Sequence, residues 1–157
     1  MAQIQIVYGS NSGNTKMVCE YLQMQLEKAG LEVLIDRGEH FPEDQLVGHD
    51  LLILACSTYG HGQLEDHFKK AFWPRIQDLD LKGQRCAVIG LGDSRYDTDY
   101  NIESAKILEH YVMSHNGELI QKSLLINKSP LPQLESKVAD WAQKLIEKYK
   151  PKTNRVF

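Results

Sequence analysis

The segment "YGSNSGNT", residues 8–15, joins a strand-like pattern to a helix-like pattern and decides how the chain folds. Before it, the apolar run "IQIV" at residues 4–7 is typical of a buried strand. After it, apolar side chains recur at helical spacing, which predicts a helix over residues 14–29. The apolar stripe consists of Val18, Leu22, Leu26 and Ala29. Because backbone N–H groups at a helix N-terminus attract anions, this junction predicts a phosphate site.

The loop is rich in groups that donate hydrogen bonds to phosphate oxygens. These donors are the side chains of Ser10, Ser12, Asn14 and Thr15. Gly9 and Gly13 permit a close approach of the backbone and positive φ angles. The loop is neither a Walker A motif, since no Gly-Lys-Ser/Thr follows, nor a G-x-G-x-x-G fingerprint. Ordinary helix capping is the alternative, but it needs one such residue rather than a run of them.

Strand-like and helix-like patterns alternate along the rest of the chain. Further strands are predicted at residues 31–36, 50–58, 84–93 and 118–126, and further helices at residues 64–77, 102–115 and 132–149. Five strands that alternate with helices predict an α/β fold whose parallel sheet is covered on both faces. We expect a single domain over residues 1–150 and a frayed basic tail at residues 151–157.

Two further loops follow the third and fourth predicted strands. In "STYGHGQLEDH", residues 57–67, Tyr59 is flanked by small residues and could lay its ring over a flat ligand. In "GLGDSRYDTDY", residues 90–100, Tyr96 could stack on the other face of the ligand, and Asp93 could form hydrogen bonds with the polar edge of its ring. The alternatives are a tyrosine packed on its own loop and a solvated acidic turn. Since ligands of such sheets bind at the carboxyl ends of the strands, the three loops together predict a site for a phosphorylated flat ring.

These three loops resemble the flavin-binding loops of flavodoxins. "GSNSGNT" resembles the family's phosphate loop, while "STYGHG" and "GDSRY" resemble the loops whose aromatic residues cover the flavin, Tyr59 and Tyr96 in this chain. The resemblance extends from Ile4 to about Tyr149, with no insertion in the fifth strand, as in the short-chain branch. It implies a doubly wound, five-stranded parallel sheet with strand order 2-1-3-4-5 and helices on both faces.

The resemblance also implies a non-covalently bound FMN. The cofactor-binding residues that it implies are Ser10, Asn11, Ser12, Gly13, Asn14, Thr15, Ser57, Thr58, Tyr59, Gly60, His61, Gly62, Leu91, Gly92, Asp93, Tyr96 and Tyr100. Many members carry tryptophan in place of Tyr59 and an acidic residue in place of His61. We expect no catalytic residue and no metal site, because none of the six histidines lies in a nucleophile motif or at metal-ligand spacing.

The function that the resemblance implies is that of a low-potential one-electron carrier. It would shuttle electrons between a reductase, such as a ferredoxin/flavodoxin-type NADP reductase, and electron-accepting enzymes. A flavin-dependent NAD(P)H or quinone reductase on the same fold is the alternative, and NAD(P)H oxidation by the purified protein alone would favour it. A receiver-type signalling domain is a third hypothesis, but it needs clustered acidic residues after the first strand, where this chain has serines and glycines.

Composition agrees with a cytoplasmic monomer that binds neither nucleic acid nor membrane. The 157 residues carry a net charge of −3, and residues 144–157 alone carry +4, so the rest of the chain is acidic and suits a basic protein partner. Acidic residues expected around the cofactor edge are Glu65, Asp66, Asp93, Asp97, Asp99 and Glu103. No signal peptide or membrane-spanning run is recognisable, and the three cysteines are expected to be buried free thiols.

Overall fold

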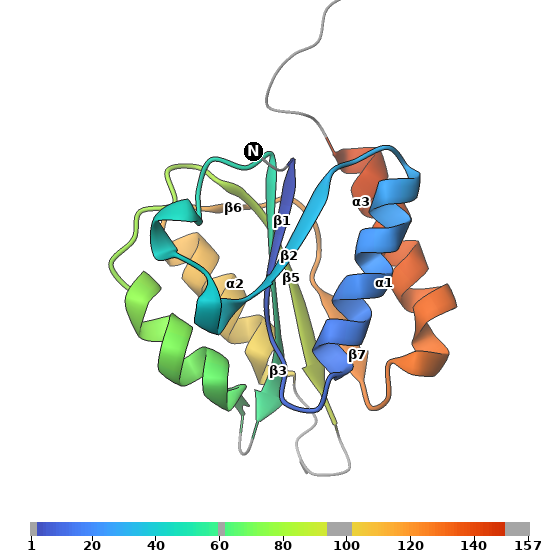
Figure 1. Cartoon of the computed structure of the whole chain (residues 1–157), viewed down its shortest axis with the longest axis horizontal. Coiled ribbons are helices and arrows are strands. Elements are labelled where there is room, and N and C mark those ends of the chain that lie inside the picture. The colour runs from blue at the N-terminus through green and yellow to red at the C-terminus, as the bar shows by residue number, and fades with distance from the viewer. Residues whose placement is uncertain (1–2, 60–61, 94–101, 150–157) are drawn as a thin grey trace, which may run out of the picture.

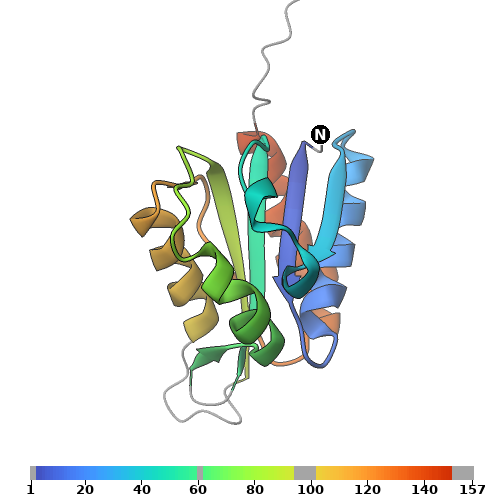
Figure 2. The same ribbon diagram turned by 60° about the vertical axis from the view of Figure 1, so that its left-hand side comes forward.

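The computed structural model describes residues 3–59, 62–93 and 102–149. Its centre is a parallel sheet of three long strands, β1 (Ile4–Gly9), β3 (Leu51–Tyr59) and β5 (Arg85–Gly92), with β2 (Val33–Arg37) beside β1. The central strands are nearly continuous apolar runs, because a parallel sheet with both faces covered has no solvated side. Figure 2 shows these strands side by side with their carboxyl ends at one edge.

The predicted fifth strand consists of two short strands, β6 (Glu118–Leu119) and β7 (Leu124–Asn127). Both pair in parallel with β5, so the expected 2-1-3-4-5 order is confirmed, with the last strand in two pieces. At the interruption the chain makes hydrogen bonds to α3 (Ala139–Lys148). Gln121 donates a hydrogen bond to the Trp141 carbonyl at 3.0 Å, and the Trp141 indole donates to the Lys122 carbonyl at 2.7 Å. The Lys122 carbonyl therefore bonds to a side chain of α3 and not to a neighbouring strand.

Helices cover both faces of the sheet, as expected for a doubly wound fold. In Figure 1, α1 (Asn14–Lys28) and α3 (Ala139–Lys148) lie on one side, and α2 (Glu103–Ser114) lies on the other with the helical turns of residues 68–76. Each side has its own buried apolar cluster, one built around α1 and α3 and one around α2. Ala29, the last residue of the predicted α1 stripe, is exposed because the helix ends at Lys28.

Two predicted helices are more irregular than the sequence suggested. The segment expected as one helix over residues 64–77 begins with β4 (Gln63–Leu64), which pairs antiparallel with β3. A π-helical turn, η3 (Phe68–Phe72), and a 3-10 turn, η4 (Trp73–Ile76), follow. Pro74 lacks an N–H group and cannot continue α-helical hydrogen bonding, which accounts for the change of winding.

The helix predicted over residues 132–149 is likewise regular only in its second half. It is preceded by two short turns, η5 (Leu131–Gln133) and η6 (Leu134–Val138). Two more short turns, η1 (Gly38–His40) and η2 (Glu43–Gln45), connect β2 to β3. Within the described ranges no helix is long and apolar enough to cross a membrane.

Candidate cofactor site

Four loops converge on a cavity of about 400 Å³ at the carboxyl edge of the sheet. This volume is within the usual range for small-molecule sites. The described residues that line it are Asn11, Ser12, Asn14, Ser57, Thr58, Tyr59, Leu91, Gly92, Asp93, Lys128 and Ser129. The three loops singled out in the sequence therefore do meet, and a fourth loop joins them.

The first loop is held in shape by its own backbone and by β2. Gly13 has φ +91°, a left-handed conformation that favours glycine, and its N–H donates to the Ser10 hydroxyl at 3.0 Å. Arg37 at the end of β2 donates to the Ser10 carbonyl at 2.9 Å. The guanidinium group of Arg37 also lies 5.4 Å from the centre of the Tyr8 ring and 2.8 Å from the Glu39 carboxylate. These contacts hold the Ser10–Gly13 part of the loop through groups of the protein itself.

The start of α1 offers hydrogen-bonding groups that the rest of the described chain does not use. Thr15 is fully buried, and its Oγ1 has no hydrogen-bond partner among the described residues. Within the same part of the chain, no side chain caps the helix, so its first-turn N–H groups are left for another acceptor. A buried hydroxyl group without a partner is unfavourable. An anion placed at this helix N-terminus would bond to both kinds of donor.

Gly9 is required for packing and not for a left-handed turn. Its φ is not positive, whereas that of Gly13 is. A Cβ atom at Gly9 would lie 2.5 Å from the Cβ of Phe68, which is completely buried. The expectation of a positive φ at Gly9 is therefore wrong, because this glycine lets the Phe68 side chain pack directly on the end of β1.

The second loop is anchored to α2 by a chain of hydrogen bonds. The Thr58 hydroxyl donates to Ser104 Oγ at 3.0 Å, and the Ser104 hydroxyl donates to the Cys56 carbonyl at 2.9 Å. The Ser104 N–H also donates to Thr58 Oγ1 at 3.1 Å. Beyond this anchor, Tyr59 pairs with Gln63 of β4. Tyr59 is 49% exposed, so its ring is available to a flat ligand.

Glu65 does not belong to an acidic rim, contrary to expectation. It is completely buried, and its carboxylate accepts hydrogen bonds from the N–H groups of His67 and Phe68 at 3.1 Å each. It therefore caps the helical turns that start at residue 66, as a carboxylate at a helix N-terminus does. Asp66 and Glu103 are partly exposed and each pairs with a lysine one helical turn away, Lys70 and Lys106.

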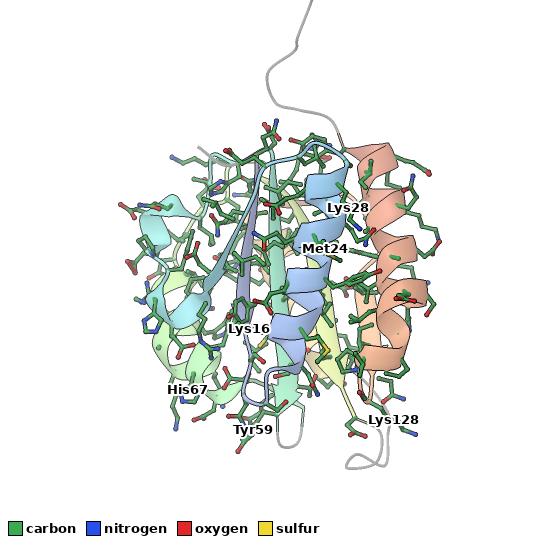
Figure 3. All side chains as sticks on the ribbon, turned by 45° about the vertical axis from the view of Figure 1, so that its right-hand side comes forward. Lys16, Met24, Lys28, Tyr59, His67 and Lys128 are labelled. Carbon is green, nitrogen blue, oxygen red and sulfur yellow. The ribbon has the colours of Figure 1, made fainter. Side chains whose placement is uncertain are left out.

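The fourth loop, at the end of β7, was missed in the sequence. Lys128 and Ser129 line the cavity, and the Lys128 N–H donates to the Gly92 carbonyl at 2.8 Å. Lys128 has φ +67°, which is rare for a residue with a Cβ atom. One signal could have found this loop, since it follows the fifth strand and so reaches the same edge as the other three. Figure 3 shows Tyr59 and Lys128 at this end of the molecule.

The remaining predicted residues fall into two groups. Four lie in the converging loops without lining the cavity: Ser10, Gly13, Thr15 and Gly62. Four others lie outside the described residues: Gly60, His61, Tyr96 and Tyr100. Asp97 and Asp99 of the expected acidic rim also lie outside them.

The three cysteines are free and buried, as expected. Burial raises the pKa of the Cys86 thiol to about 12, and it raises the pKa values of Cys19 and Cys56 further. Cys56 lies directly before the second loop, and its sulfur accepts a hydrogen bond from the Glu65 N–H at 3.4 Å. A thiol with so high a pKa is protonated at neutral pH and is not a nucleophile, so these groups are structural.

Fold and cavity together define a doubly wound α/β protein in which an uncapped helix N-terminus and an exposed aromatic side chain lie at the carboxyl edge of the sheet. The family model for flavodoxin matches residues 6–141. The chain is 31% identical to the flavodoxin of Nitratidesulfovibrio vulgaris over 150 residues, which cover 93% of this chain and 98% of that one. It superposes on the structure of oxidised flavodoxin 2 from Bacillus cereus with a TM-score of 0.83 and 30% identity, covering 94% and 100% of the two chains. The chain belongs to the flavodoxin family.

Membership of this family gives the chain its class of function. It is an FMN-binding electron-transfer protein and not an enzyme. A related domain occurs in a larger protein: NADPH-dependent diflavin oxidoreductase 1 of Bos taurus is 26% identical over 152 residues, which cover 94% of this chain and 25% of that one.

Proposed function

We propose that the cavity at the carboxyl edge of the sheet holds FMN, and that the chain carries low-potential electrons between a reductase and electron-accepting enzymes. The observation that carries this proposal is the fully buried Thr15 hydroxyl at the start of α1, which has no partner among the described residues. A terminal phosphate group at the start of α1, beside the cavity-lining Asn14, would give it an acceptor, and the flat ring would then extend across the cavity toward Tyr59. FMN supplies the one-electron chemistry, and the protein supplies binding and orientation.

Each loop would contact a different part of the cofactor. The phosphate would be bound by the first loop, with Ser10, Asn11, Ser12, Gly13, Asn14 and Thr15 as its residues. Tyr59 would cover one face of the ring, and Ser57, Thr58, Gly60, His61 and Gly62 would contact its edge. The third loop, with Leu91, Gly92, Asp93, Tyr96 and Tyr100, would hold the other side. The hydrogen bonds between Thr58 and Ser104 would fix the position of the Tyr59 ring relative to the cavity, because they connect the second loop to α2.

A ferredoxin/flavodoxin-type NADP reductase is the proposed electron donor. The related bovine oxidoreductase contains a matching region within a longer NADPH-dependent protein, which supports a reductase as the neighbour in electron transfer. For this chain the reductase would be a separate cytoplasmic protein that docks on a monomer. Because Asp93 lines the cavity with Tyr59 and the Glu103 side chain lies against Gly62 of the second loop, a basic docking face would be steered there.

Binding of FMN and riboflavin to the cofactor-free chain tests the proposed site. Both ligands carry the same ring, but riboflavin lacks the phosphate and would leave the buried donors at α1 unpaired. We expect FMN to bind at least tenfold more tightly than riboflavin, as followed by quenching of flavin fluorescence. Equal affinities would contradict the phosphate assignment.

Steady-state kinetics test the carrier role. The purified holoprotein alone should not oxidise NADPH, whereas adding a ferredoxin-type NADP reductase should allow its reduction, seen as bleaching of the flavin absorbance. The rate should fall as salt screens the docking faces. NADPH oxidation by the holoprotein alone would instead favour a flavin-dependent reductase.

A further inference from the structure

Lys128 is the one cation among the described residues that line the cavity, and Asp93 is the one anion. Asn11, Ser12 and Asn14 on the facing loop offer neutral donors only. Lys128 is exposed, and among the described ion pairs none involves its ammonium group. Lys128 is therefore a positive charge at the cavity that no described ion pair engages.

The backbone at Lys128 is held in an unusual conformation. Its φ of +67° is left-handed, and its N–H is fixed by the bond to the Gly92 carbonyl. A residue with a Cβ atom persists in this region only where its surroundings require it, and such residues gather at ligand sites. Lys82, with φ +53°, is a second left-handed lysine, but it lies in the turn before β5 at the opposite edge of the sheet. Its conformation therefore serves a turn and not this cavity.

We propose that Lys128 is a specificity residue for the phosphate end of FMN, an inference that rests on the proposed cofactor site. The phosphate of FMN carries nearly two negative charges at neutral pH. Donors in the first loop can bond to its oxygens but cannot neutralise it. Lys128 approaches the same cavity from the end of β7 and supplies the opposite charge. A lysine ammonium binds phosphate as a point charge on a long flexible stem, so it does not need the fixed geometry of the first loop.

Lys16 provides the contrast that makes the proposal specific. It is also an exposed lysine close to the phosphate loop, in the first turn of α1, but it does not line the cavity. Figure 3 places Lys16 on α1 and Lys128 at the end of the molecule where Tyr59 lies. If proximity to the loop were enough, both lysines would contribute equally to affinity.

Binding of FMN and of riboflavin to the cofactor-free protein distinguishes a specific role of Lys128 from a general effect of any lysine near the phosphate loop. The variants are Lys128→Gln, Lys128→Arg, Lys16→Gln and Lys82→Gln. In 50 mM NaCl, Lys128→Gln should raise the Kd for FMN roughly five- to tenfold and the Kd for riboflavin less than about twofold. Lys128→Arg, Lys16→Gln and Lys82→Gln should each change both constants less than about threefold. In 1 M NaCl the effect of Lys128→Gln on FMN should fall to about twofold, because salt screens the pair.

Inorganic phosphate gives a readout that does not depend on the flavin. At matched ionic strength, phosphate should raise the Tm of the cofactor-free wild-type chain more than that of Lys128→Gln. A similar loss of affinity for both flavins in Lys128→Gln would overturn the inference, as would equal effects of Lys128→Gln and Lys16→Gln. A wild-type chain that responds to phosphate through Lys128 but does not bind FMN would refute the proposed cofactor and leave the anion site standing.

Discussion

Replacement of Thr15 by valine should change protein stability and cofactor affinity in opposite directions. The two side chains have nearly the same shape, so the substitution exchanges one buried hydroxyl for a methyl group and leaves packing intact. Thr15 is completely buried, and within the described residues its hydroxyl has no hydrogen-bond partner. In the cofactor-free protein the valine should therefore be stabilising, because a buried unpaired polar group is removed.

The expected magnitudes follow from the burial of this single group. A buried polar group without a partner costs about 1–3 kcal/mol. Threonine and valine have similar helix propensities, so the backbone contributes little to the difference. A gain of about 1 kcal/mol corresponds to a Tm increase of roughly 2–4 °C in a chain of this size. In the complex, loss of a hydrogen bond to a charged phosphate should cost about 1.5–3 kcal/mol, which weakens FMN binding roughly 10- to 150-fold.

Thermal unfolding of the cofactor-free chain and flavin titration measure the two effects on the same preparation. Ser12→Ala is the matched control, because Ser12 belongs to the same loop but is exposed to solvent. That variant should bind FMN less tightly while leaving the Tm of the cofactor-free chain nearly unchanged. Riboflavin affinity should hardly change in either variant.

Two results would refute this reasoning. A lower Tm for cofactor-free Thr15→Val would show that the hydroxyl has a partner within the protein. An equal loss of FMN and riboflavin affinity would show that Thr15 acts on the ring and not on the phosphate.

Three further predictions concern the elements that support the site. Gly9→Ala should destabilise the protein by about 1–3 kcal/mol in urea unfolding, because its Cβ would lie 2.5 Å from that of Phe68; unchanged stability would mean that β1 can shift without cost. Ser104→Ala should lower stability by about 1–3 kcal/mol and also shift the flavin potential in a redox titration, since Thr58 loses its anchor; a stability change without a potential shift would limit Ser104 to a structural role. Burial raises the pKa of Cys86 to about 12, so the native chain should not react with Ellman's reagent at pH 8, and thiol labelling should follow unfolding; rapid labelling of native protein would contradict this.

The sequence predicted the junction between β1 and α1 well because local and tertiary preferences agree there. The apolar run, the glycine at position 13 and the helical stripe each favour the same boundary, and the structure places α1 at Asn14–Lys28. Convergence of the loops was predictable for a similar reason, since the carboxyl ends of parallel strands must share an edge.

Features that depend on long-range contacts were not predictable in this way. The split between β6 and β7 follows from hydrogen bonds between residues 121–122 and Trp141, about twenty positions away along the chain. The burial of Glu65 depends on helical turns whose winding was itself misjudged. Lys128 carries no motif, and its role becomes visible only when the end of β7 is seen beside Gly92.

The two faces of the sheet are covered by separate apolar cores, and the cavity lies where loops from both sides meet. The first and fourth loops lead into the helices of one core, α1 and α3, whereas the second is bonded to α2 of the other. A ligand in the cavity therefore touches both cores at once and joins them through contacts that the sheet alone does not provide. Binding energy released at the edge is shared by the two layers, so the loaded protein should unfold as one cooperative unit. Local opening of either layer should therefore be rarer in the loaded protein than in the empty chain.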